Sequence, residues 1–135
     1  METTTQPDVS AAATSSRPQC VLLVEDDAML RRCIARMLEH HGRRVWCAGD
    51  GIEALEIFRE RAGEIDVVIL DISMPRSDGP TTLAKLRTID PCVPVIFSSG
   101  QLDDRLDTSV AAGVQGVLPK PYTSKQMLEV LRSFQ

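Results

Sequence analysis

Short apolar runs alternate with segments of helical period from residue 20 to the end of the chain, and this alternation constrains the fold more than any other feature. The runs are residues 20–24, 44–48, 65–70, 93–98 and 116–118. Between and after them, apolar residues recur every three or four positions, which predicts amphipathic helices. The helical segments are residues 28–41, 51–62, 81–89, 103–112 and 124–134. Strands that alternate with helices predict an α/β domain, a parallel sheet with helices on both faces, because each right-handed crossover needs a covering element.

Composition places one compact domain after a short polar segment. The chain has 135 residues, of which 43% are apolar and 25% charged, as in soluble globular domains. Residues 1–18 are rich in Thr, Ser, Ala and Pro, so we expect a disordered tail or linker there and the folded domain at 19–135. No apolar run approaches the roughly 20 residues of a membrane span. The start of the chain lacks the basic and apolar regions of a secretion signal.

Charge and cysteine content exclude some functions. The net charge of −4 argues against a general nucleic-acid binder but allows a protein partner or a cation. The cysteines are Cys20, Cys33, Cys47 and Cys92. They form no CxxC pair, and the two histidines are adjacent, so a zinc site is not expected. We expect free, mostly buried thiols in a reducing cytosol, hence a cytoplasmic protein.

Polar residues follow each predicted strand, at the edge where sites form in open parallel sheets. The groups are Glu25-Asp26-Asp27, Ala48-Gly49-Asp50, Asp71, Ser98-Ser99-Gly100 and Pro119-Lys120-Pro121. Singly, each has an ordinary structural explanation. Asp26, Asp27 or Asp50 can cap a helix, Ser99 can cap or form a turn, and Lys120 can be a solvated lysine. Asp71 is harder to explain, because the next helix is not expected before about residue 81.

Together, these groups predict phosphoryl chemistry. The first and third strands are expected to be neighbours, which brings Glu25, Asp26 and Asp71 close enough to repel one another unless a cation lies between them. Oxygen ligands without histidine or cysteine suit Mg²⁺. Lys120 supplies a compact positive charge for a phosphoryl oxygen, and Ser99 a hydroxyl. A carboxylate in this setting can attack phosphorus and become an acyl phosphate.

Four motifs resemble the receiver domain of two-component response regulators. They are VLLVEDD at 21–27, LDISMPRSDG at 70–79, PVIFSSG at 94–100 and GVLPKP at 116–121. The resemblance covers residues 20–134. It implies a flavodoxin-like, doubly wound single domain, with a five-stranded parallel sheet in the order 2-1-3-4-5 and five helices.

The resemblance also implies roles for the metal and phosphoryl site. Asp71 is the implied phosphoacceptor, and Asp26 is the implied direct ligand of Mg²⁺. Glu25 would reach the metal mainly through water. Asp71 itself and the backbone carbonyl of Ser73 would complete the protein ligands.

Further roles concern the groups around that site. Ser99 corresponds to the hydroxyl that moves toward the phosphoryl group, and Lys120 would bridge Asp71 and the phosphate. The Lys120–Pro121 bond is expected to be cis. Asp27 is expected to cap a helix rather than bind metal. Gly79 is expected to allow a tight loop through a positive φ.

The chain departs from the common family pattern at a few positions. Val117 stands where the family often has an aromatic residue that swings between buried and exposed positions, and a valine cannot do this. Ser73 and Gln101 stand where the family tunes hydrolysis of the phosphoryl group, and neither offers a carboxylate to orient water.

The function that the resemblance implies is a phosphorylation-dependent switch rather than an enzyme. A histidine kinase or histidine phosphotransfer protein would phosphorylate Asp71. The surface of residues 103–112, 116–118 and 124–134 would then meet a protein partner. A free-standing regulator and the receiver part of a hybrid kinase both remain open. The alternatives are an unphosphorylated interaction scaffold and an aspartate-nucleophile phosphohydrolase, which Ser73 disfavours because that enzyme needs an acid there.

Overall fold

The computed structural model describes residues 17–72, 79–99 and 114–134, and this part of the chain holds five strands and four helices. In chain order they are β1 Cys20–Val24, α2 Ala28–His40, β2 Arg44–Ala48, α3 Gly51–Arg61, β3 Val67–Asp71, α4 Gly79–Ile89, β4 Val95–Ser99, β5 Gly116–Pro119 and α6 Ser124–Arg132. The predicted helix at 103–112 lies outside the described residues. No helix among the described residues is long and apolar enough to cross a membrane.

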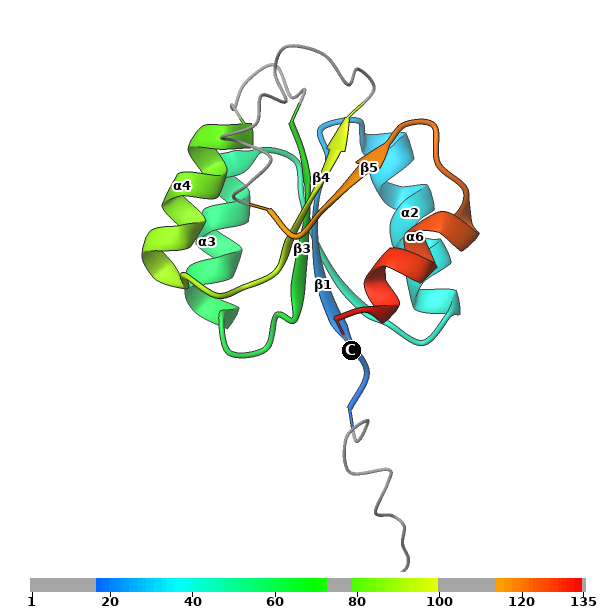
Figure 1. Cartoon of the computed structure of the whole chain (residues 1–135), viewed down its shortest axis with the longest axis horizontal. Helices are drawn as coiled ribbons and strands as arrows, with labels where there is room; N and C mark the ends of the chain where they lie inside the picture. The colour runs from blue at the N-terminus through cyan, green and yellow to red at the C-terminus, as the bar shows by residue number, and fades with distance from the viewer. Residues whose placement is uncertain (1–16, 73–78, 100–113, 135) are drawn as a thin grey trace, which may run out of the picture.

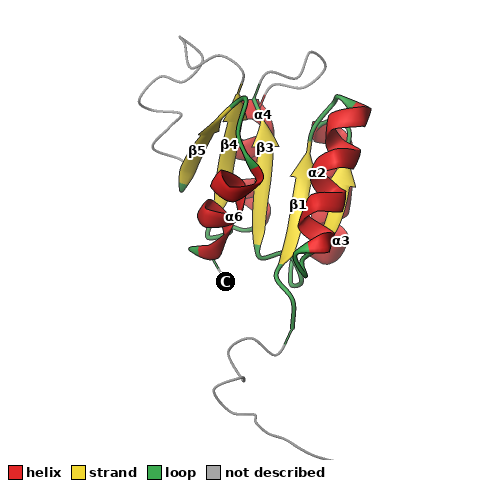
Figure 2. Cartoon of the chain, turned by 90° about the vertical axis from the view of Figure 1, so that its right-hand side faces the viewer, coloured by secondary structure: helices red, strands yellow, loops and turns green. Residues whose placement is uncertain are grey.

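The sheet is parallel and has the order β2-β1-β3-β4-β5, which confirms the predicted flavodoxin-like arrangement. β1 lies between β2 and β3, with Val24 opposite both Ala48 and Leu70. The helices α3 and α4 cover one face of the sheet, and α2 and α6 cover the other (Figures 1 and 2). The carboxyl ends of all five strands therefore meet at one edge.

The core consists of two apolar layers, one on each side of the sheet, because alternate residues of a strand point to opposite faces. Leu22, Leu70 and Phe97 pack in the layer with Phe58 of α3. The other layer is formed by Val21, Leu23, Ile34, Leu38, Val67, Ile69, Ile96, Leu118, Met127 and Leu131. β1, β3 and β4 are buried along their whole length, so the sheet holds their ends rigidly at the carboxyl edge.

Helix ends follow local sequence signals. Asp27 caps α2 by accepting hydrogen bonds from the backbone N–H groups of Met29 and Leu30. Asp50 caps α3 by accepting from Glu53 N at 2.8 Å. Both predicted caps are confirmed. Gly42, which has a φ of +84°, follows the end of α2, where glycine is common because it adopts this conformation without strain.

The reason for Gly79 differs from the prediction. Among the described glycines only Gly42 has a positive φ, so Gly79 does not use that freedom. A Cβ atom at Gly79 would instead lie 2.7 Å from the Cα of Ile72. Glycine is required here because the start of α4 approaches the backbone that leaves β3 too closely for a side chain.

Some residues of the predicted apolar stripes are exposed. The helical period of the apolar residues in 51–62 groups Ile52 with Leu55 and Phe58 and predicts all three inward, yet 71% of the Ile52 surface is exposed. At 3.6 residues per turn Ile52 lies about 120° around the helix from Phe58, which explains the error. Cys33 is exposed as well, because it lies about 100° from the inward Ile34.

The expectation of mostly buried thiols is therefore wrong. Cys20 is buried in β1 and Cys47 is half-buried in β2. Cys33 and Cys92 are exposed, and all four thiols are free.

Arg17 marks the point at which the described chain begins. Its guanidinium forms two hydrogen bonds with the carboxylate of Asp66, at 3.0 and 2.7 Å. Asp66 also accepts from Cys20 N at 2.8 Å, so this carboxylate links the segment before β1 to the start of β3.

Candidate functional site

Three carboxylates meet where β1 and β3 end. Val24 and Leu70 are opposite each other in the sheet, so Glu25 and Asp71, which follow them, emerge side by side. Oxygen atoms of Glu25, Asp26 and Asp71 lie within 4.8 Å of one another. We call these three residues the acidic cluster. Glu25 and Asp71 are only 2% exposed, whereas Asp26 is exposed and leaves the cluster open to solvent.

Lys120 supplies positive charge to the acidic cluster from the end of β5. Its Nζ atom lies 2.8 Å from Glu25 Oε1 and 3.2 Å from Asp71 Oδ2. Lys120 N donates to Ser99 O at 2.7 Å, which ties this residue to the end of β4. The Lys120–Pro121 bond is cis, as the family resemblance implied.

Burial, hydrogen bonds and charge oppose one another at this site, and the pKa values of Glu25 and Lys120 are both raised overall. Burial raises the pKa of Glu25 to about 7, and the charge of Asp71 acts in the same direction, while the hydrogen bond from Lys120 opposes the rise. Burial alone would lower the pKa of Lys120. Its hydrogen bond to Glu25 and the charge of Asp71 outweigh that effect and raise this pKa overall.

The acidic cluster fits a hard cation. Its donors are carboxylate oxygens, it contains neither nitrogen nor sulfur ligands, and one member faces solvent. Three carboxylates around a single ammonium leave negative charge that a divalent ion would neutralise. The donor set is therefore compatible with Mg²⁺.

Ser99 lies beside the acidic cluster in the sheet. It is the last residue of β4, and it is buried. The preceding residue, Ser98, is opposite Asp71, so Ser99 stands one position further toward the carboxyl edge. Ser73 and Gln101, which stand where the family tunes hydrolysis of the phosphoryl group, lie outside the described residues. Glu25, Asp26, Asp71 and Lys120 are thus brought together, with Ser99 on the adjacent strand.

One residue near the site was missed by sequence reasoning. Arg31 of α2 donates from Nη1 to the backbone carbonyl of Glu25 at 2.7 Å. In the sequence Arg31 stands next to Arg32, and both fit a solvated helix face. Only the path of α2 past the end of β1 distinguishes the half-buried Arg31 from the exposed Arg32.

Val117 occupies the place where the family resemblance led us to consider an aromatic residue. It lies in β5 opposite Phe97 of β4. Its side chain is half-buried and packs against the core layer that contains Phe97. This side chain fills space in the core, and its branched carbons have no ring to exchange between two positions.

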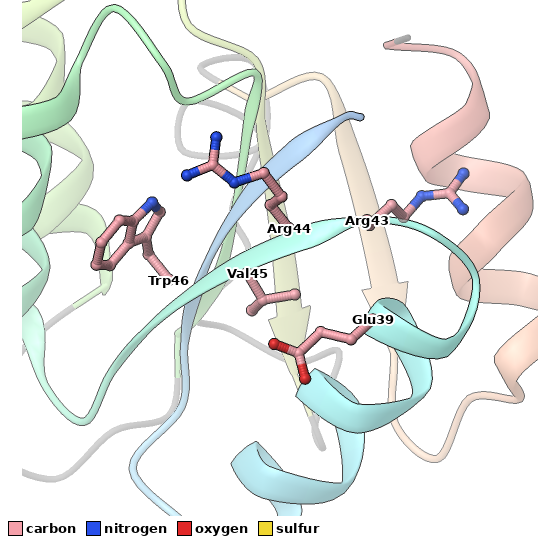
Figure 3. Close-up of a pocket in the computed structure, with 5 residues that line it drawn as sticks. All are labelled: Glu39, Arg43, Arg44, Val45 and Trp46. Carbon is pink, nitrogen blue, oxygen red and sulfur yellow. The ribbon is translucent and has the colours of Figure 1, made fainter. Parts of the chain in front are cut away.

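A pocket of about 220 Å³ lies away from the acidic cluster. It is lined by Glu39, Arg43, Arg44, Val45 and Trp46, at the end of α2 and the start of β2 (Figure 3). Arg43 Nε donates to Gln19 Oε1 at 2.8 Å, and the guanidinium of Arg61 stacks 4.0 Å above the Trp46 ring. The first contact joins the residues that precede β2 and β1, and the second joins β2 to α3, so the side chains that line the pocket have structural roles.

Comparison with solved structures supports the fold. In the CheX–CheY–BeF3–Mg complex from Borrelia burgdorferi, the matched chain superimposes with a TM-score of 0.82 at 26% identity, covering 90% of this chain and 92% of that one. The receiver domain of the hybrid histidine kinase CckA matches with a TM-score of 0.71 at 41% identity, covering 84% and 96% of the two chains.

Sequence comparison identifies the family. The chain is 40% identical over 126 residues to the sensor kinase CckA of Brucella abortus, covering 93% of this chain and 13% of that protein. It is 34% identical to the response regulator MprA of Mycobacterium leprae, over 84% of this chain and 49% of that one. The chain thus spans half or less of these curated relatives. The family model of the response regulator receiver domain matches residues 21–132, and the chain belongs to this family.

Proposed function

We propose that this receiver domain accepts a phosphoryl group on Asp71 in a Mg²⁺-dependent reaction and thereby switches a protein-binding surface. The observation that carries the proposal is the position of Asp71. Its carboxylate is buried at the end of β3, with an ammonium 3.2 Å away and two further carboxylates within 4.8 Å. A structural aspartate needs a counter-charge, but it does not need two more acids beside it.

The proposed reaction is transfer from phosphohistidine. An Asp71 carboxylate oxygen attacks phosphorus, the new O–P bond forms, and the bond from phosphorus to the imidazole nitrogen of the donor breaks. The displaced imidazole nitrogen then takes up a proton from solvent. In the transition state Lys120 stabilises negative charge on the phosphoryl oxygens, because its Nζ already contacts the attacking carboxylate.

The acidic cluster would hold the metal. Asp26 and Asp71 are the proposed direct ligands, together with the backbone carbonyl of Ser73, and Glu25 is proposed to act through water. Bound Mg²⁺ would offset the charge of the cluster and of the incoming phosphoryl group. The Ser99 hydroxyl is proposed to move toward the phosphoryl group and so transmit its presence to the segment that follows β4.

Two kinds of partner follow from this proposal. Receiver domains are signalling modules that interact with histidine kinases or phosphotransfer proteins, and such a protein is the proposed donor. Met29 and Ile52 are 74% and 71% exposed and stand in the first turns of α2 and α3, which begin at the edge that carries the acidic cluster. They offer apolar contacts for the donor. The output partner is proposed to bind the face of residues 103–112, β5 and α6.

Phosphorylation by a small-molecule donor tests the proposal. The protein is incubated with acetyl phosphate and Mg²⁺, and its intact mass is measured. We expect one added phosphoryl group on the wild-type chain, none with EDTA, and none on Asp71→Asn. The control is Asp50→Asn, which changes a carboxylate outside the acidic cluster and keeps a side chain that can cap α3. This variant should gain the phosphoryl group normally. An unmodified wild-type chain, or an equal gain in Asp71→Asn, would favour the unphosphorylated scaffold.

A further inference from the structure

We propose that Arg31 is a positioning residue that holds the turn carrying Glu25 and Asp26 and thereby sets the affinity of the site for Mg²⁺. The inference rests on the proposed metal site. It concerns a residue whose hydrogen bond to the site goes to a backbone carbonyl, that of Glu25, so that its proposed action runs through the backbone.

The hydrogen bonds of Glu25 show what Arg31 contributes. Glu25 N donates to Ala48 O at 3.0 Å, which extends the ladder between β1 and β2. Its two carboxylate oxygens accept from Lys120 Nζ at 2.8 Å and from Asp27 N at 3.2 Å. The remaining polar group is the carbonyl oxygen, which accepts from Arg31 Nη1 at 2.7 Å. Arg31 therefore fixes the peptide plane between Glu25 and Asp26.

That peptide plane matters because of Asp26. The Asp26 side chain is exposed, and among the described residues no hydrogen bond holds its carboxylate. The direction in which it points depends on the backbone from which it projects. When the carbonyl of Glu25 is fixed, Asp26 is presented toward the other two carboxylates of the acidic cluster before any metal arrives. Such preorganisation raises affinity because less freedom is lost on binding.

Gly49 leaves room for the Arg31 guanidinium. A Cβ atom at Gly49 would lie 3.3 Å from Arg31 Nη1 and 3.8 Å from its Cζ. Gly49 N donates to Glu53 Oε1 at 2.7 Å, so the backbone of this glycine is itself held in place. The guanidinium thus lies against two connections, the one after β1 and the one after β2. This arrangement predicts that Gly49 and Arg31 act on the metal site as one unit.

A purely electrostatic role would have the opposite sign. A guanidinium near three carboxylates competes with a cation for their field, so its removal would strengthen Mg²⁺ binding. If Arg31 instead positions the turn of Glu25 and Asp26, its removal would weaken Mg²⁺ binding. The sign of the change therefore separates the two roles.

The experiment measures the binding of Mg²⁺ alone by isothermal titration calorimetry. We expect Arg31→Met, which keeps the aliphatic stem, to weaken binding about three- to tenfold, as for loss of one hydrogen bond. Arg31→Lys, which keeps a donor, should recover part of the affinity. The matched control is Arg32→Met, which removes the same charge from the exposed neighbouring position and should stay within about twofold of wild type. Unchanged or tighter binding by Arg31→Met would overturn the proposal.

A double-mutant cycle with Gly49→Ala supplies a second test that does not depend on Arg31→Met alone. Gly49→Ala should weaken Mg²⁺ binding in the wild-type background and have little further effect in Arg31→Met, because both changes displace the same guanidinium. If Arg31→Met fails to fold, the cycle is run in Arg31→Lys, where the effect of Gly49→Ala should be reduced. Fully additive effects would contradict the proposal.

Two measurements, the extent of phosphorylation and the binding of Mg²⁺ by the wild type, test this inference separately from the proposed function. At saturating Mg²⁺, phosphorylation of Arg31→Met by acetyl phosphate should reach the wild-type extent, because the phosphoacceptor is untouched. A lower plateau would contradict a positioning role. A wild-type chain that binds no Mg²⁺ would overturn the proposed function and this inference together. Equal binding by wild type and Arg31→Met would overturn the inference alone.

Discussion

Replacement of Lys120 by methionine tests the electrostatic balance of the site. The ammonium of Lys120 lies between two carboxylates, 2.8 Å from Glu25 Oε1 and 3.2 Å from Asp71 Oδ2. Lys120→Met keeps an aliphatic stem and removes the charge. Because both carboxylates are 2% exposed, little water can replace the ammonium.

The size of the effect follows from burial. Removing one partner of a buried ion pair costs about 3–5 kcal/mol, because the remaining charge is left uncompensated. The side chain of Lys120 is itself 20% exposed, which favours the lower end of this range. We expect Lys120→Met to lose about 3 kcal/mol of unfolding free energy at pH 7.5 in EDTA. The control is Lys125→Met, which replaces an exposed lysine and should change the unfolding free energy by less than about 0.5 kcal/mol.

The stability lost in Lys120→Met should increase as the pH rises. In the wild type, burial already raises the pKa of Glu25 from 4.5 to about 7, and without Lys120 this pKa rises further. A carboxyl group whose folded pKa is raised binds its proton more tightly in the folded state. Its contribution to stability is therefore lost as the pH rises from near 4.5 through the folded pKa. The deficit of Lys120→Met should be largest above pH 7 and should shrink toward pH 5.

Urea denaturation at pH 5, 6 and 7.5 measures this dependence for the wild type, Lys120→Met and Lys125→Met. Mg²⁺ should restore part of the lost stability, because it supplies positive charge to the same carboxylates. An equal deficit at pH 5 and pH 7.5 would mean that Lys120 contributes packing alone. No deficit at pH 7.5 would refute the electrostatic reasoning.

Three other predictions follow from single contacts. Gly79→Ala should cost about 1–3 kcal/mol by urea denaturation, since its Cβ would overlap Ile72, whereas Gly63→Ala, where a Cβ meets nothing within 4 Å, should cost none. Asp27→Ala should lose about 1 kcal/mol of stability with Mg²⁺ affinity unchanged by calorimetry, and weaker metal binding would assign Asp27 a ligand role. A thiol reagent should label Cys33 and Cys92 quickly and Cys20 only after unfolding, and rapid loss of the Cys20 thiol in the native protein would contradict its burial.

Much of the fold could be predicted because its signals are local. Apolar runs define buried strands, and an aspartate before a helical segment defines a cap, as at Asp27 and Asp50. β1 and β2 have the predicted bounds, whereas bounds of β3, β4 and β5 differ from the prediction by one or two residues. β3 spans Val67–Asp71 rather than 65–70, because pairing with β1 begins opposite Val21 and the carboxylate of Asp66 is used by Arg17 and Cys20.

What could not be predicted depends on contacts between distant segments. The need for glycine at Gly79 comes from Ile72 across a loop, and the role of Arg31 comes from the path of α2 past the end of β1. The exposure of Cys33 and Ile52 depends on how each helix is rotated over the sheet, which a broad apolar stripe does not fix.

The part of the candidate site that could be predicted follows from one topological rule. In a parallel sheet the residues after each strand meet at one edge, and this rule brought Glu25, Asp26, Asp71 and Lys120 together from sequence alone. The rule does not say how the side chains are oriented. The contacts of Lys120 with both Glu25 and Asp71 required the structure.

The central claim, that Asp71 is the phosphoacceptor, is tested most directly by mapping the modified residue in the wild-type chain. After reaction with acetyl phosphate and Mg²⁺, borohydride reduction converts an aspartyl phosphate to homoserine, which peptide mass spectrometry locates. We expect homoserine at position 71 and at no other aspartate. Homoserine at Asp26 or another position, or its absence from the whole chain, would contradict the claim.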